Sequence, residues 1–204
     1  MSTANDPSGF LMAEYKELRG EILKRSEIQH QLISIALVAL GALTSVGLRD
    51  APSALLAYPM LALFLSAAWS YNDIQIAQLG SYIRYRLEER LIGGGLGWEH
   101  AILSDHVSKR IGSGVKLATR GILFGSAVLA VALYLLTRLS LLIDGAERGE
   151  LVLLLLSIAA VGGTAFVLRG RDPLVKEIAE NMQKPVVGQR MNPGTFTPRH
   201  GPEQ

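Results

Sequence analysis

Four apolar runs constrain this chain more than any other feature of its sequence. Residues 32–48, 54–71, 121–137 and 151–168 each form a run of 17 or 18 residues without a single Asp, Glu, Lys or Arg. A helix needs about 17 to 25 such residues to cross roughly 30 Å of hydrocarbon, and only a helix or a closed barrel bonds its own backbone there. We therefore predict an all-α, polytopic membrane protein with four transmembrane helices, the third extending to about residue 142.

The basic residues are divided unequally between the two sides of the predicted bundle. Seventeen Lys and Arg residues lie before the first span, between the second and third, or after the fourth, whereas only Arg49, Arg138 and Arg148 lie on the other side. The positive-inside rule then predicts a multi-pass membrane protein with both termini in the cytoplasm. The sequence pI of about 9.0 follows from this orientation, so no nucleic acid partner is expected.

Long amphipathic segments adjoin the spans on the cytoplasmic side, at residues 10–31, 72–92 and 98–120. Each has apolar residues at helical spacing on one stripe and charges elsewhere. The three stripes are Leu11, Tyr15, Leu18 and Ile22; Ile76, Leu79, Ile83 and Leu87; and Leu103, Val107, Ile111, Val115 and Ala118. We predict that these cytoplasmic extensions bury their stripes against one another as a helical stalk. The alternative is that they lie flat on anionic lipid, which basic residues of the second segment would contact.

The rest of the chain divides by composition. Residues 10–172 form the predicted transmembrane domain with its stalk, after a disordered N-terminus at residues 1–9. Residues 173–183 predict a separate short cytoplasmic helix with Pro173 in its first turn. Residues 184–204 are rich in Pro and Gly without apolar periodicity, which predicts a disordered tail.

Side chains suited to catalysis or metal binding are few. The chain has no cysteine, and His100 and His106 are six residues apart, which places them on different faces of a helix. The GGGLG segment at residues 93–97 lacks the Lys-Ser/Thr of a phosphate-binding loop. No Ser, His and acidic residue can be brought together by spacing. We therefore expect no enzymatic activity, no catalytic residue, no metal site and no cofactor.

Small residues recur at helix-packing spacing in the third and fourth spans. Gly121 and Gly125 form a GxxxG pair, and Ala159 and Gly163 form a second small-xxx-small pair. Such pairs allow close approach of two helices, either within one chain or between chains. The sequence does not decide between these, and we expect a homo-oligomer.

Asp73 follows the second span closely and raises the question of what it pairs with. Trp69 and Tyr71 mark the membrane interface, so Asp73 is expected just outside the hydrocarbon. An antiparallel first helix brings Arg25 to this level, and the start of the third span brings Arg120 there. We predict an ion pair between Asp73 and one of these arginines; the alternative is a hydrated carboxylate among lipid headgroups.

The segments EYKELRGEILKRSEIQHQLIS and YPMLALFLSAAWSYNDIQIAQLGSYIR, within residues 13–98, resemble a family of small, uncharacterised bacterial integral membrane proteins. That resemblance implies a helical bundle in a bacterial inner (plasma) membrane and brings no activity. In layout the chain is also similar to small membrane-spanning effectors of bacterial conflict systems. The first hypothesis is therefore an oligomeric membrane effector or pore component controlled through its stalk. The second is an anchor or scaffold in the lipid bilayer that recruits a soluble cytoplasmic partner.

Overall fold

The computed structural model describes residues 7–49, 51–87, 106–145 and 148–183, and all of the described regular structure is helical. Its elements in chain order are α1 (Pro7–Arg49), a 3₁₀ turn η1 (Pro52–Leu56), α2 (Ala57–Tyr82), a π-helical turn η2 (Ile83–Leu87), α5 (His106–Gly145) and α6 (Arg148–Gln183). Four helices are long and apolar enough to cross a membrane: Gly9–Arg49, Pro52–Leu87, Leu117–Arg138 and Gly149–Gln183. The predicted all-helical class with four apolar spans is confirmed.

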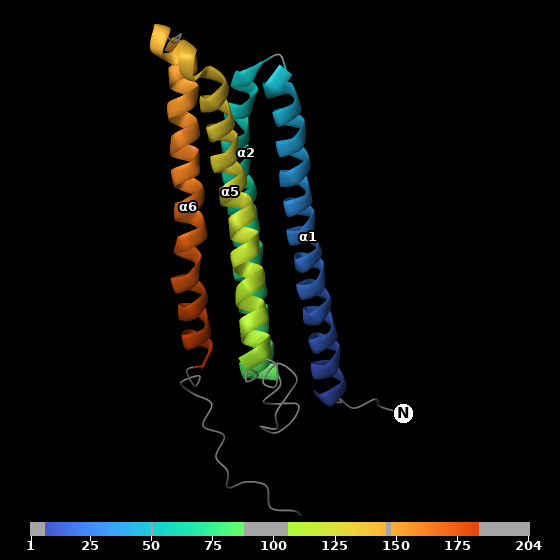
Figure 1. Cartoon of the computed structure of the whole chain (residues 1–204). Helices are drawn as coiled ribbons and strands as arrows, with labels where there is room; N and C mark the ends of the chain where they lie inside the picture. The colour runs from blue at the N-terminus through green and yellow to red at the C-terminus, as the bar shows by residue number, and fades with distance from the viewer. Residues whose placement is uncertain (1–6, 50, 88–105, 146–147, 184–204) are drawn as a thin grey trace, which may run out of the picture.

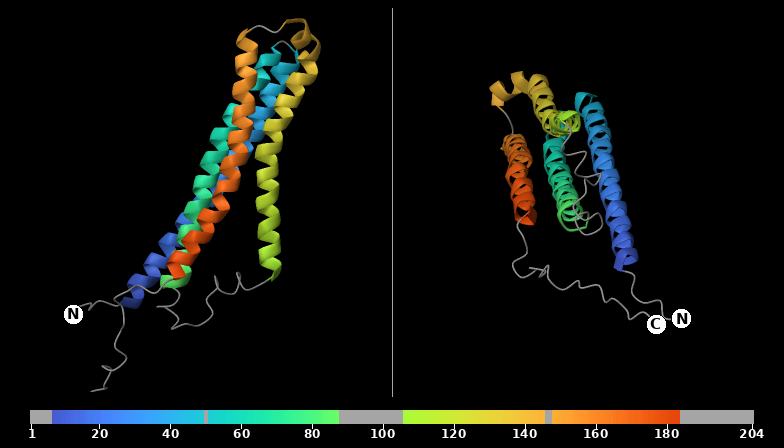
Figure 2. Two further views of the ribbon diagram at one scale, coloured as in Figure 1. Left: turned by 90° about the vertical axis from the view of Figure 1, so that its left-hand side faces the viewer. Right: turned by 90° about the horizontal axis from the view of Figure 1, so that it is seen from below.

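The four long helices lie side by side, with α2 in the middle of the bundle (Figures 1 and 2). Helix α2 contacts α1, α5 and α6 directly. Half of the most apolar stretch of the second span is buried inside the bundle, compared with 11% of the most apolar stretch of α1. The first residues of α1 and α5 and the last residues of η2 and α6 lie at the same end of the bundle (Figure 1). At the other end of the bundle, α1 ends near η1, and α5 ends near the start of α6 (Figure 1).

Helix α1 is one unbroken helix of 43 residues. At 1.5 Å per residue it is about 65 Å long, roughly twice the hydrocarbon thickness of a bilayer. No proline occurs within it after Pro7, so nothing in the sequence interrupts the backbone hydrogen bonds between the amphipathic segment and the apolar run. The helix begins at Pro7, three residues before the predicted start, so residues 7–9 are helical rather than disordered.

The predicted short helix at residues 173–183 is not a separate element. Helix α6 continues through Pro173 to Gln183 without a break. A proline removes one helical hydrogen bond, here that of the Arg169 carbonyl, and usually kinks or ends a helix. At this position ion pairs from Arg171 to α2 and from Asp172 to α5 hold the chain on its helical path. The fourth helix therefore has its own long extension beyond the apolar run.

The core is formed by three clusters along the bundle axis. The cluster at the level of the charged end contains Ala36, Leu65, Trp69, Leu123 and Leu168, and so draws on all four long helices. A middle cluster contains Tyr58, Ala62, Ala127 and Ala130, and a third at the turn end contains Leu55, Leu56 and Tyr134. Alanines in the middle cluster bring α2 and α5 close together, as is common between membrane helices.

The extension beyond the apolar runs contains two helices that were predicted for it, α1 and α2 with η2, and the end of α6, which was not predicted there. Ile83 and Leu87 of the second predicted stripe are buried, and the Tyr82 hydroxyl donates a hydrogen bond of 2.9 Å to Glu14 of α1. The third member is α6: a groove of about 420 Å³ is lined by Ile22 of α1, residues 76–85 of α2 and η2, and Val175 and Ala179 of α6.

Helix α5 leans away from the other three helices toward its own N-terminal end (Figure 2). Of its predicted stripe, Ala118 is exposed, and the other four side chains lie outside those described. The α6 extension packs beside α1 and α2 here, and the part of the stalk predicted for residues 98–120 stays a prediction. The fold thus provides a three-helix extension beyond a four-helix apolar bundle.

Candidate functional site

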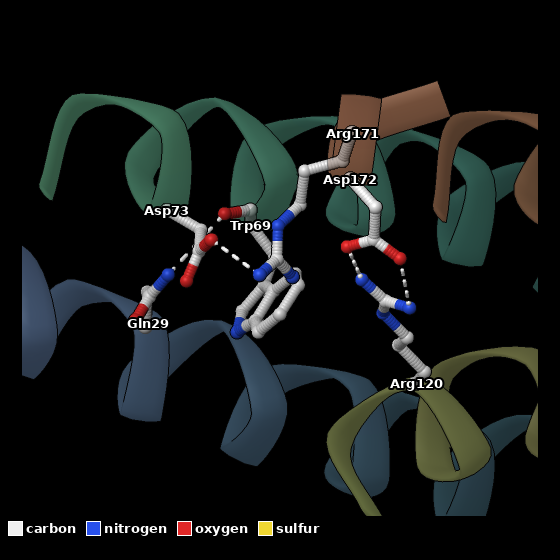
Figure 3. A network of polar contacts seen from close by, with 6 residues as sticks. All are labelled: Gln29, Trp69, Asp73, Arg120, Arg171 and Asp172. Carbon is white, nitrogen blue, oxygen red and sulfur yellow. Dashed lines mark hydrogen bonds and ion pairs between the residues drawn. The ribbon is translucent and has the colours of Figure 1, made fainter. Parts of the chain in front are cut away.

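A layer of charged side chains crosses the bundle where the apolar runs end (Figure 3). At its centre, the Arg171 Nη2 atom of α6 lies 2.6 Å from the Asp73 Oδ2 atom of α2. The Arg171 side chain is 2% exposed and that of Asp73 13% exposed. An ion pair so little exposed is shielded from water and salt, so its two charges depend on each other.

Two further side chains complete the surroundings of this pair. The Arg171 guanidinium lies over the Trp69 ring, with its Cζ atom 5.0 Å from the ring centroid. The Gln29 Nε2 atom of α1 donates a hydrogen bond of 3.4 Å to the Trp69 carbonyl. The Nε and Nη1 atoms of Arg171 are buried without a hydrogen-bond partner among the described residues. The ring face of Trp69 is therefore a substantial part of what stabilises this cation.

A second ion pair lies beside the first and joins α6 to α5. Both terminal nitrogens of Arg120 donate to the two carboxylate oxygens of Asp172, at 2.9 and 2.5 Å. This two-pronged geometry is the strongest form of an arginine–carboxylate contact. The Asp172 side chain is 61% exposed, however, which places this pair in a much wetter setting than the Asp73–Arg171 pair.

The electrostatic effects on the two arginines are opposite. Burial lowers the pKa of Arg171 from its ordinary value, against the opposing attraction of Asp73. The hydrogen bonds that Arg120 donates to Asp172 raise the pKa of Arg120, with a smaller opposing effect of burial. An arginine does not lose its proton in a protein. The two arginines are therefore fixed positive charges that fasten helices together.

The predicted partners of Asp73 were wrong. Arg25 lies 2.8 Å from Glu21 of its own helix, and Arg120 is taken by Asp172. Asp73 pairs instead with Arg171, because α6 continues past its apolar run and carries this arginine into the bundle. The alternative of a freely hydrated Asp73 carboxylate is excluded by the same contact.

The sequence analysis missed Arg171 and Asp172 because Pro173 pointed to a break at this point. The available signal was the charge pattern Arg-Asp next to the end of an apolar run, matched by Asp73 and Arg120 at the ends of two others. Gln29 and the ring of Trp69 carried no signal of a role in this layer.

Of the four residues predicted to pack helices, one faces a neighbouring helix of the bundle and three lie on its outer surface. Gly163 faces α2, and a Cβ atom built on it lies 3.1 Å from Leu63. Gly121 and Gly125 are exposed and have no atom within 4 Å of such a Cβ position, and Ala159 is also exposed. Within the described chain, only Gly163 of these four serves close helix packing.

Most hydroxyl groups of the spans bond within the bundle. The Tyr58 hydroxyl donates to Ser126 Oγ at 2.8 Å, and Ser157 Oγ lies 2.8 Å from the Leu56 carbonyl of the neighbouring element. Ser66 and Thr164 donate to the carbonyl four residues earlier. These four hydroxyls therefore have hydrogen-bond partners within the bundle, two of them across helices.

No group of three or more His, Cys, Asp or Glu side chains suited to a metal ion occurs in the part of the chain that the structure describes. His100 and the glycine-rich segment at residues 93–97 lie outside that part. No protein-family model, curated protein or solved structure matches this chain. The resemblance to a bacterial membrane family thus stays a prediction, and function has to be argued from the geometry.

Proposed function

We propose that this protein is a non-enzymatic membrane anchor in a bacterial inner membrane, whose stalk recruits a soluble cytoplasmic protein. The observation that carries the proposal is the apolar surface of α1 beyond its apolar run. Met12 and Leu23 are 47% and 71% exposed. They are eleven residues apart, about three helical turns, and so lie on one face of α1, with Lys16 and Arg19 between them on that face. Outside the hydrocarbon, exposed apolar side chains bordered by polar ones are typical of a protein-binding surface.

The rigidity of the stalk supports the same function. Each of its three helices is continuous with a predicted span, and the Asp73–Arg171 pair joins two of them at the junction. The Tyr82–Glu14 hydrogen bond joins α2 to α1 farther along. A preorganised surface binds a partner with a smaller entropic penalty than a flexible one.

The oligomeric effector or pore is a second candidate, supported by the outward position of the GxxxG pair. Gly121 and Gly125 are free to receive a helix of a second copy. A conduit inside one chain is disfavoured, because the centre of the bundle holds three apolar core clusters and buried, hydrogen-bonded hydroxyls. A pore would therefore have to form between copies.

Site-specific photocrosslinking in living cells tests the anchor function. A photoreactive amino acid at Leu23 should give one discrete crosslinked product with a soluble cytoplasmic protein. The matched control is Leu136, a similarly exposed leucine of α5 at the opposite end of its apolar run, which should not give that product. Products at Leu23 that contain only lipid or a second copy of the chain would contradict the proposal.

A further inference from the structure

The groove between α5 and α6 has the chemistry of a phospholipid site. It has a volume of about 400 Å³, within the range of small-molecule sites in proteins, and is open to the outside of the bundle. Its lining consists of Leu117, Gly121 and Phe124 of α5, Ala165 and Leu168 of α6, and the two arginines Arg120 and Arg169.

The position of the two arginines matches the depth of a lipid headgroup. Arg120 immediately precedes the third apolar run and Arg169 immediately follows the fourth, so both stand at the same predicted membrane surface. The apolar walls begin with the next residue of each run and continue toward the hydrocarbon. A ligand that fits must therefore be anionic at one end and apolar along the rest.

The net charge of the side chains at the groove suits one bound anion. Asp172 takes two of the five N–H donors of Arg120 and holds its guanidinium in place (Figure 3). Arg169 is exposed and has no ion pair or hydrogen bond among the residues that the structure describes. Two arginines and one aspartate leave a single positive charge, which equals in magnitude the charge of one phosphodiester.

We propose that this groove binds one anionic phospholipid from the cytoplasmic leaflet. Its phosphate contacts Arg169 and the remaining Nη N–H groups of Arg120, and an acyl chain lies along Gly121, Phe124 and Leu168. Basic pockets between transmembrane helices on the cytoplasmic side are a known mode of anionic lipid binding. The proposal goes beyond the anchor function and does not depend on it. A helix of a second copy is the competing occupant, since Gly121 belongs to the GxxxG pair.

The test is a titration of the full chain, purified in a neutral detergent, with phosphatidylglycerol, read by native mass spectrometry. We expect one tightly bound lipid, weaker binding of zwitterionic phosphatidylethanolamine, and no displacement by inorganic phosphate. Arg169→Gln should weaken phosphatidylglycerol binding about fivefold, from roughly 1 kcal/mol per basic residue near a membrane surface. Lys176→Gln is the matched control, because Lys176 lies two turns farther on the same face of α6, is exposed, and does not line the groove.

A second pair of variants separates lipid from a second copy. Gly121→Leu fills the groove without a clash inside the chain, and Gly125→Leu places the same side chain one turn away, outside the groove lining. Gly121→Leu should lose the bound lipid and Gly125→Leu should keep it. Equal affinity of Arg169→Gln and the unaltered protein would overturn the proposal. So would displacement by inorganic phosphate, or a loss of lipid in both glycine variants accompanied by a loss of oligomers.

Discussion

Removing one partner of the Asp73–Arg171 pair should destabilise the bundle strongly. Asp73→Asn leaves the Arg171 guanidinium, 2% exposed, without its counter-ion, and Arg171→Gln does the same to a carboxylate that is 13% exposed. Breaking a buried pair in this way costs about 3–5 kcal/mol of unfolding free energy. We expect about 3 kcal/mol for each variant, because the pair lies at the end of the apolar runs and the Asp73 side chain is not fully buried.

The double variant isolates the interaction itself. When both charges are removed, neither is left buried alone, so the double variant should be less destabilised than the two single variants predict by addition. We expect a coupling of about 2 kcal/mol, within the range of about 0.5–3 kcal/mol measured for residues in contact. The measurement is reversible unfolding of the purified protein in mixed detergent, followed by far-UV circular dichroism, for all four members of the cycle.

The neighbouring pair supplies the control cycle. Arg120→Gln and Asp172→Asn remove an ion pair of the same chemistry, but the Asp172 side chain is 61% exposed. Its coupling should therefore be about 0–1 kcal/mol, as for pairs in water. If the Asp73–Arg171 cycle were additive within about 0.3–0.5 kcal/mol, the two side chains would not be paired in the folded protein and the reasoning would be refuted.

Three further predictions follow from the packing of the bundle. Tyr58→Phe should lower the free energy of unfolding by about 1 kcal/mol, because a serine of α5 loses a hydrogen bond. Tyr134→Phe should leave it unchanged, because the buried Tyr134 hydroxyl has no partner among the described residues. Equal losses of unfolding free energy in the two variants would contradict this. Gly47→Ala should lower the free energy of unfolding by about 1–3 kcal/mol, because its Cβ atom would lie 2.5 Å from a leucine of η1. Gly41→Ala adds its Cβ atom in open space and should raise the free energy of unfolding by up to about 1 kcal/mol. A Gly47→Ala variant that is more stable than the unaltered protein would show that the contact is wrong. Purified protein in liposomes should carry no ionic current, and currents that Gly125→Leu abolishes would favour the pore.

The spans could be predicted because their signal is local. An uncharged run of 17 or 18 residues has one stable form in a bilayer, and no distant contact has to be known to recognise it. The unbroken α1 followed from the same logic, since residues 7–49 contain no proline after the first and keep their helical pattern throughout.

The charged layer could not be predicted because it depends on the path of α6. Pro173 has a strong local preference to interrupt a helix, and ion pairs with α2 and α5 override this preference. The partner of Asp73 follows from that path, so an error about Pro173 became an error about the ion pair. For the same reason, the end of α6 was not predicted as a part of the stalk.

The packing residues show a different limit. The spacing of Gly121 and Gly125 indicates that a helix can approach closely, but it carries no information about which neighbour does so. In the fold these two glycines face outward, whereas Gly163 meets α2. Sequence spacing predicted the kind of surface, and only the arrangement of the helices showed its direction.

Cysteine accessibility tests the membrane topology on which the account depends. The chain has no cysteine, so single cysteines can be placed at Lys176, on the exposed surface of the stalk, and at Gly149, where a Cβ atom meets open space. A membrane-impermeant thiol reagent applied to cells with a permeable outer envelope should label Gly149→Cys and not Lys176→Cys, and should label both after the inner membrane is opened. Labelling of Lys176→Cys before that membrane is opened would contradict a cytoplasmic stalk.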